Sequence, residues 1–387
     1  MEKKVNNRLL SLDILRGITI AGMILVNNPG SWNYVYTPLG HASWNGLTPT
    51  DLIFPFFMLI MGVSTFIALR KFNFEPSKPL LRKIIKRTLI IFLIGIALSW
   101  FAVSLRTYHS LAEENLGFLE RWAKAITNFE KIRILGVMQR LALSYGITSL
   151  IVIFVKHKYI PYIIATILVG YIFLLHLGNG YATEGYNLLA VTDQNILGLN
   201  HMYVEYGVDP EGILSTIPCI AHVLIGFYIG KILVEKKDND QRMLQLFIIG
   251  TVFTFLGLLL SYGFPINKKI WTSTFVLTSC GMGILFLALL IYIIDVKGHK
   301  KWTPFFETFG VNPLFIYVLA GVIAITLGGI RFDYGGEIVS AKGYFYSQVL
   351  QPLFGDYVGS LVFALLFVGL LWSVGYILYK KRIYIKL

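Results

Sequence analysis

A histidine with an unusual set of neighbours is the residue best suited to chemistry in this 387-residue chain. His41 stands within ten residues of Trp44, Asn45 and Asp51, between two strongly apolar stretches. Histidine is the side chain most often used for proton transfer near neutral pH. The chain has no HExxH or CxxC motif, so no metal site is expected. A lone histidine in a loop is often an ordinary surface residue, and that alternative stays open for His41.

Burying an ionisable group in an apolar stretch is costly, so such a group is a functional candidate by default, and Asp13, Arg16 and Arg140 are three of this kind. Asp13 and Arg16 are three residues apart, hence on one helical face, and either form an internal salt bridge or serve a ligand. Arg140 has no acidic neighbour in its own stretch. Its partner must come from another helix, with Asp13 or Asp51 as candidates, or from a bound anion.

Polar residues also stand where helices are expected to begin. The sequence TPTD at 48–51 has the pattern of a capping box, with proline at the first helical position and an acid at the third. The sequence DPE at 209–211 predicts a second helix start of the same kind. Asn312 and Pro313 interrupt an apolar stretch and predict either a simple kink or a broken helix with free N–H groups beside a cavity.

The composition indicates which elements must position these residues. Hydrophobic residues make up 56% of the chain and charged residues only 14%, against roughly 25% in a soluble domain. We therefore expect an all-α polytopic membrane protein, one transmembrane domain over residues 1–387. Its two cysteines both lie in apolar stretches, so no disulfide framework is available. Ten stretches have bilayer-spanning length: 9–27, 52–70, 85–105, 134–155, 159–178, 212–234, 243–262, 271–295, 304–328 and 358–379.

The distribution of Lys and Arg predicts the orientation of these spans. If the N-terminus is cytoplasmic, the segments on that side carry 23 of the 34 basic residues and the outer loops carry 9. Both termini are therefore expected in the cytoplasm. The first span, preceded by MEKKVNNR, has no cleavage site after it and is expected to be retained. The net charge of +13 mostly reflects this bias and gives no reason to propose nucleic acid as a partner.

One outer loop has a distinctive composition. Residues 179–211 contain no Lys or Arg but carry five acids and four tyrosines. Long loops of this kind are often functional. Aromatic rings suit the C–H faces of a sugar and carboxylates suit a positive amine, so the loop fits an amino sugar. An acidic, solvated loop without a ligand is the alternative, and it is equally compatible with the composition.

Several motifs together resemble the heparan-α-glucosaminide N-acetyltransferase family within the transmembrane acyltransferases. They are SLDILRG, VNN and HASWNGLTPTDLIFPFFMLIMG in the first 62 residues, then GVMQRL, DPEGILSTI, FPINKKIWTSTFVLTS, DVKG and VNPLFIYV, in the family's order up to about residue 318. The run HASWNGLT followed by DLIFPFF is long and unusual, whereas SxDxxRG alone is shared more widely. The resemblance implies a compact bacterial version in the cytoplasmic membrane, without the large lumenal region of the animal enzyme.

The resemblance implies acetyl transfer across the membrane from cytoplasmic acetyl-CoA to the amine of a glucosamine-type or heparan-type sugar outside. The family's catalytic histidine falls on His41, and an asparagine of the family falls on Asn27. His41 then serves as general base, and the amide of Asn27 donates to the oxyanion. In a ping-pong alternative, His41 is itself acetylated. Candidate residues for the sugar are Trp44, Asn45, Asp51, Asp209 and Glu211; those for acetyl-CoA are Arg16, Arg140 and Asn312, with Asp13 shaping the site.

Other functions stay open at this point. Ten spans with internal charges and a broken helix also fit a secondary transporter for sugars or cell-wall fragments, although HASWNG has no counterpart in residues 200–387 and no internal repeat is visible. An O-acyltransferase of a surface glycan is a third possibility. Glycines within the spans permit close helix contacts, so a homodimer is also left open.

Overall fold

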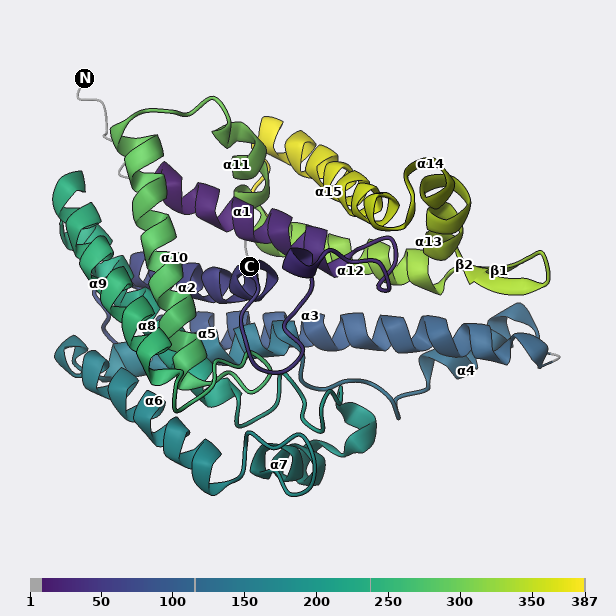
Figure 1. The fold of residues 1–387 in the computed structure, drawn as a ribbon, viewed down its shortest axis with the longest axis horizontal. Helices are drawn as coiled ribbons and strands as arrows, with labels where there is room; N and C mark the ends of the chain where they lie inside the picture. The colour runs from purple at the N-terminus through teal and green to yellow at the C-terminus, as the bar shows by residue number, and fades with distance from the viewer. Residues whose placement is uncertain (1–8, 115, 237, 386–387) are drawn as a thin grey trace.

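A computed structural model describes residues 9–114, 116–236 and 238–385, and nearly all of the regular structure in them is helical (Figure 1). Nine of the described helices are long and apolar enough to cross a bilayer, or ten if one bent pair counts as a single span. The predicted all-α, polytopic membrane fold is therefore confirmed. The basic N-terminal segment 1–8, with Lys237 and Lys386, lies outside the described residues, so the charge-based orientation stays a prediction.

Nine of the ten predicted spans correspond to single long helices. They are α1 (Leu10–Asn27), α2 (Pro49–Arg70), α3 (Lys78–Ser110), α5 (Val137–Phe154), α6 (Ile160–Leu177), α8 (Thr216–Glu235), α9 (Asn239–Leu260), α10 (Ser273–Leu290) with its π-helical extension (Ile291–Val296), and α15 (Asp356–Lys380). Helix α3 is much longer than the apolar stretch that predicted it, because both of its ends continue into polar sequence.

The remaining predicted span is broken. It consists of α11 (Thr303–Val311) and α12 (Pro313–Gly329), which meet at an angle of 83°. The sharp break at Asn312 agrees with the broken-helix alternative. The Asn312 side chain donates to the carbonyl of Ile383 and accepts from the N–H of Ile385, both at 2.8 Å. This asparagine therefore ties the C-terminal segment to the helix break.

Several short elements connect the spans and were not predicted. Helix α4 has charges on one face and apolar residues on the other, too few for a spanning stretch. The hairpin β1–β2 pairs its strands antiparallel, with Arg331 opposite Ser340. These elements are α4 (Phe118–Ile126), α7 (Leu188–Leu197), β1 (Arg331–Tyr334), β2 (Glu337–Ser340), α13 (Ala341–Tyr344), a π-helix (Phe345–Leu350), α14 (Gln351–Phe354) and 3₁₀ turns at Thr37–Leu39, Leu111–Glu113, His157–Tyr159 and Leu199–His201.

Close helix contacts at glycines hold the bundle together. A Cβ added at Gly62 of α2 would lie 2.2 Å from the carbonyl oxygen of Val223 in α8, and one added at Gly226 of α8 would lie 2.1 Å from that of Leu59. Helices α1 and α11 touch in the same way at Gly17 and Gly310. Such backbone approach is typical of helix packing in membranes. The hydrophobic effect does not drive helix association there, and small residues allow the close van der Waals packing that does.

The bundle has two ends of different chemistry. At the "site end", loop 28–48 and loop 261–272 meet: the N–H of Gly46 donates to the carbonyl of Ile266, and Asn267 donates to Asn45. The "basic end" is where α2 ends and α3 begins (Figure 1), and it carries Lys83 and Arg87 of α3. The first turn of α1 packs on α11, whose following residue Asn312 binds the C-terminal segment. Both described ends of the chain therefore lie at one end of the bundle.

Candidate active site

The first turn of α2 fixes a carboxylate at the site end. Thr48 and Asp51 form the predicted capping box, with Oδ2 of Asp51 accepting from the N–H of Thr48 at 3.1 Å. The same oxygen accepts from the N–H of Ala42 at 3.0 Å. The side chain of Asp51 is only 1% exposed, so it can adopt no other arrangement without losing these bonds. Capping thus leaves the second carboxylate oxygen, Oδ1, aimed at loop 28–48.

That second oxygen contacts the candidate histidine. Nδ1 of His41 lies 2.6 Å from Oδ1 of Asp51, while the imidazole remains 45% exposed. An ionised carboxylate only accepts hydrogen bonds, so Nδ1 carries the proton of this contact. The other ring nitrogen, Nε2, then holds a lone pair and faces away from Asp51. The pair has the orientation that a general base requires: one nitrogen anchored and one free.

A lysine from the other loop completes the group. Nζ of Lys268 lies 3.3 Å from Oδ1 of Asp51 and 3.1 Å from Nδ1 of His41. Burial lowers the pKa of Lys268, and Asp51 acts in the opposite direction. Sequence reasoning missed this residue, although FPINKK belongs to a motif and carries the only two basic residues of its loop. The contact joins positions 227 residues apart, which no spacing rule could have paired.

An arginine and two carboxylates lie next to this group. Arg133 donates to Asp209 at 2.5 Å and to Glu211 at 2.6 Å. Burial would raise the pKa of Glu211, but the charges of Arg133, Arg140 and Lys268 hold it below its usual value. The prediction that DPE starts a helix is wrong, because α8 begins only at Thr216 and Asp209 instead binds Arg133 and the N–H groups of its own turn. Arg133 was not among the predicted residues.

The acidic loop 179–211 is largely neutralised by partners. Glu205 forms a close ion pair with Lys269, whose ammonium also lies 4.6 Å from the ring centre of Tyr206. Tyr206 in turn packs against Trp44, with ring centres 5.5 Å apart. Of the loop's acids, only the exposed Glu184 has no ion pair or side-chain hydrogen bond among the described residues. The loop therefore offers a sugar ammonium fewer free carboxylates than its composition suggests.

Asp193 carries a pH dependence that can be measured. Its carboxylate is buried, with the N–H of Ile213 donating at 2.8 Å, and burial raises its pKa to about 6 from an ordinary 3.8. The folded protein thus binds this proton more tightly than the unfolded chain does. The free energy of unfolding should therefore fall as pH rises from about 4 to about 6, and the loss should persist above pH 6.

Asp193→Asn keeps an acceptor for Ile213 but removes the charge. We expect this variant to melt at the same temperature as the wild type near pH 4 and at a higher one at pH 7, a gain of at most about 3 kcal/mol. Melting temperatures of both proteins across pH 4–7 test this. A difference that is constant over that range would contradict the assignment.

A cavity of about 300 Å³ opens between α1, α3, α5 and α12, beside the group of Arg133, Asp209 and Glu211. Asn27, at the end of α1, lies in its wall together with Arg133. The neighbouring Asn28 also lines the cavity, but it is buried and donates its amide to the carbonyl of Ile24, whereas Asn27 is exposed. Asn27 and His41 thus lie at the same end of the bundle, and Arg133, which shares the cavity with Asn27, pairs with Glu211, whose carboxylate feels the charge of Lys268.

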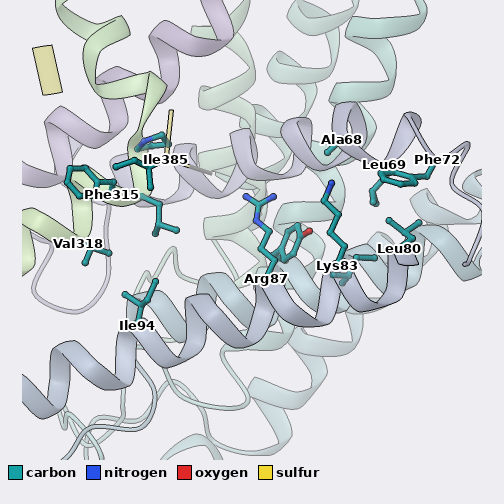
Figure 2. Close-up of a pocket in the computed structure, with 14 residues that line it drawn as sticks. Ala68, Leu69, Phe72, Leu80, Lys83, Arg87, Ile94, Phe315, Val318 and Ile385 are labelled. Carbon is teal, nitrogen blue, oxygen red and sulfur yellow. The ribbon is translucent and has the colours of Figure 1, made fainter. Parts of the chain in front are cut away.

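A second cavity, of about 420 Å³, lies at the basic end. Figure 2 shows Lys83 and Arg87 pointing from α3 into it, with Phe315 and Ile385 on the other side. Nε of Arg87 is buried without a hydrogen-bond partner among the described residues, and its guanidinium lies 4.6 Å from the ring centre of Tyr145. A buried donor without an acceptor indicates room for an anionic ligand or for water.

The two cavities follow each other along the same helix pair. Ile94 of α3 lines the cavity at the basic end and the next residue, Gly95, lines the cavity at the site end. On α12 the corresponding neighbours are Val318 and Tyr317. The two cavities therefore lie one after the other along α3 and α12, the first beside Lys83 and Arg87 and the second beside Asn27.

The charges inside the spans have structural partners. Asp13 and Arg16 form the predicted pair at 3.0 Å, and Arg16 also donates to Ser64 and to the carbonyl of Gly310, so it links α1 with α2 and α11.

Arg140 forms no ion pair with Asp13 or Asp51 in the part of the chain that the structure describes, so that suggestion is wrong. Its guanidinium donates to Ser215 and stacks on Trp271, while Nε and Nη1 are buried and have no hydrogen-bond partner among the residues that the structure describes. It lines neither cavity.

Within residues 9–114, 116–236 and 238–385, no group of three or more His, Cys, Asp or Glu side chains is placed to hold a metal ion. A multi-pass helical membrane protein with a His–Asp pair at one end of its helix bundle is the class that the fold and the site define. The chain belongs to the heparan-alpha-glucosaminide N-acetyltransferase family, whose catalytic-region model matches residues 8–264. The matched range contains His41, Asp51 and Arg133 and ends just before Lys268.

Two curated relatives extend the similarity over more of the chain. The heparan-alpha-glucosaminide N-acetyltransferase of Mus musculus is 27% identical over 442 aligned residues, which cover 98% of this chain and 61% of the relative. The enzyme of the same name from Homo sapiens is 29% identical over 369 residues, which cover 80% of this chain and 52% of the relative. The chain thus spans little more than half the length of these relatives.

Proposed function

We propose that this protein is a transmembrane N-acetyltransferase. It moves the acetyl group of acetyl-CoA to the amine of a glucosamine-type sugar on the opposite face of the membrane, with His41 as general base. The observation that carries the proposal is the His41–Asp51 pair at the site end of the bundle, combined with a cavity at the basic end that Lys83 and Arg87 line. The names of the curated relatives, which describe acetyl transfer to a glucosaminide, support the reaction class.

The cavity at the basic end suits the donor. CoA carries phosphate groups, and Lys83 and Arg87 supply the cations that bind phosphates most strongly. The first residues of α12, Pro313 to Phe315, line the same cavity, and a helix start favours anions. Asn312 shapes this region by holding Ile385 at the cavity wall. Direct contacts of Arg16 and Arg140 with acetyl-CoA remain part of the proposal.

The double variant Lys83→Gln/Arg87→Gln tests the donor site. Each lost charge-assisted hydrogen bond is worth about 1.5–3 kcal/mol, so losing two should raise the Kd for CoA by roughly 10²–10⁴-fold. Arg82→Gln/Lys86→Gln is the matched control, because it removes the same charge from exposed neighbouring positions of α3 that do not line this cavity. Calorimetric titration with CoA measures both. Equal affinity in the two double variants would show that the phosphates bind elsewhere.

The chemistry proceeds through a tetrahedral intermediate. The neutral sugar amine attacks the thioester carbonyl, and Nε2 of His41 accepts the proton that the nitrogen loses. The carbonyl oxygen becomes an oxyanion, which the amide of Asn27 stabilises by donating a hydrogen bond. Collapse of the intermediate breaks the C–S bond and releases CoA as the thiolate, which takes a proton from solvent or from His41. In the ping-pong alternative, His41 Nε2 attacks the thioester first and carries the acetyl group to the amine.

The acceptor is proposed to bind at the site end. Trp44 and Tyr206 form an aromatic surface for the sugar, next to Asn45. Asp51, Asp209 and Glu211 are the proposed carboxylates near its amine, although Arg133 and His41 already occupy part of their capacity.

We place the protein in the cytoplasmic membrane, with its basic end and both termini facing the cytoplasm. Residues 1–387 form a single transmembrane domain in this proposal. A homodimer is compatible with this arrangement.

Product analysis tests the proposed function. The purified protein in lipid nanodiscs is incubated with acetyl-CoA and glucosamine, and mass spectrometry follows N-acetylglucosamine while a thiol reagent follows free CoA. We expect equal amounts of both products. Acetylation of sugars that lack an amine would favour an O-acyltransferase. Sugar binding without any thiol release would favour a transporter.

A further inference from the structure

The ammonium of Lys268 is the part of the site that the proposed mechanism does not use. It comes from loop 261–272, on the far side of the site from α2, and its side chain is 20% exposed. It contacts two partners at once, Oδ1 of Asp51 at 3.3 Å and Nδ1 of His41 at 3.1 Å. An ionised carboxylate only accepts, so Nδ1 donates to Asp51, and Lys268 donates to Oδ1 of Asp51 while it contacts the imidazole as a charge. Its position must therefore be explained by charge.

Charge at this position opposes the effect of Asp51. A buried carboxylate 2.6 Å from an imidazole favours the protonated, imidazolium form, because opposite charges stabilise each other. An imidazolium has no lone pair and cannot act as a base. A cation at 3.1 Å on the same nitrogen disfavours that form. The carboxylate of Asp51 thus orients the ring, and the ammonium of Lys268 offsets the stabilisation of the imidazolium that this carboxylate would otherwise cause.

We propose that Lys268 is a positioning residue that keeps His41 in its neutral form, with Nε2 free to accept a proton. It contacts the base and its carboxylate rather than the substrate. The other charged groups around this contact are Glu211, from loop 179–211, and the adjacent Lys269, which act on Lys268 with opposite signs. The inference rests on the proposed function only for its kinetic consequence, since the protonation of His41 can be measured without any substrate.

Carbethoxylation measures that protonation directly. Diethyl pyrocarbonate reacts with neutral imidazole, and mass spectrometry of the His41 peptide gives the modification rate at each pH. We expect the midpoint of this rate profile to move upward by about one pH unit in Lys268→Met, the lower limit for a close charge. Lys268→Arg keeps the charge and should keep the wild-type midpoint. Lys269→Met is the matched control, since it removes a buried cation from the same loop that pairs with Glu205 instead.

Kinetics supply the second arm. The acid limb of the kcat/KM profile should shift upward in Lys268→Met to the same extent as the modification profile, and Lys268→Arg should restore it. Lys268→Gln repeats the test if the methionine variant does not fold. An unchanged midpoint in both neutral variants overturns the proposal, and so does an inactive Lys268→Arg, because that result would mean that the lysine must lose its own proton. If no variant or wild-type protein transfers acetyl, the proposed function fails while the modification profiles still decide the role of Lys268.

Discussion

His41→Ala should fold, insert and bind acetyl-CoA as the wild type does, yet lose acetyl transfer by roughly 10²–10⁴-fold in kcat/KM. The reason is geometric. Nδ1 is engaged by Asp51, and Nε2 is the free basic nitrogen of the pair. Because the imidazole is 45% exposed, its removal leaves no cavity in the core, and the loss should appear in catalysis rather than in stability. Steady-state kinetics with glucosamine, together with CoA affinity and melting temperature, measure all three properties.

His109→Ala is the control for that experiment. His109 lies near the opposite end of the long helix α3 from Lys83, remote in sequence from the motifs of the site, and makes its ring contact with Tyr108. We expect it to keep wild-type transfer. Acetylation of His41 on incubation with acetyl-CoA alone would establish the ping-pong route. Near wild-type transfer by His41→Ala would contradict both routes and return this histidine to an ordinary surface role.

Asn27→Ala should lower kcat by about 10²–10³-fold, the usual cost of losing one oxyanion donor. Asn27 is the last residue of α1 and lines the cavity at the site end, so its amide is available to a ligand there. Its neighbour provides the control. Asn28→Ala removes an amide from the same cavity wall that is already engaged by the carbonyl of Ile24, and should cost stability without a comparable loss of rate.

The combination of the two variants carries further information. If Asn27 and His41 act on the same intermediate, the double variant should lose less than the product of the single losses, because residues that act as one unit fail together. Fully multiplicative losses would indicate that Asn27 acts in a different step, such as binding of the donor. An Asn27→Ala protein with an unchanged kcat and a raised KM would place its amide in ground-state binding instead.

Local patterns predicted local features of this protein well. Apolar length located the spans, and the TPTD pattern predicted the capping box that aims Asp51. The break at Asn312 also follows from a two-residue signal, since proline cannot continue the preceding hydrogen-bond ladder. In each of these cases the determining interactions lie within a few residues of the pattern.

Contacts between distant segments could not be predicted in this way. Lys268 and Arg133 join the site across 227 and 76 residues, and their loops gave no periodic signal. The DPE pattern predicted a helix start, but Arg133 binds both of its acids and holds the chain in a turn until Thr216. Tertiary ion pairs thus overrode a local preference. Arg140 shows the reverse: its burial was expected from its span, but its partners, Ser215 and Trp271, were not.

Transfer across the membrane is the central claim, and sidedness in proteoliposomes tests it most directly. Glucosamine is trapped inside vesicles that carry the protein, and acetyl-CoA, which does not cross lipid, is added only outside. We expect N-acetylglucosamine inside the vesicles and an equal amount of free CoA thiol outside, with neither formed by His41→Ala. Product that forms only when both substrates share one side of the membrane, or glucosamine that leaves the vesicles unmodified, would contradict transfer across the membrane.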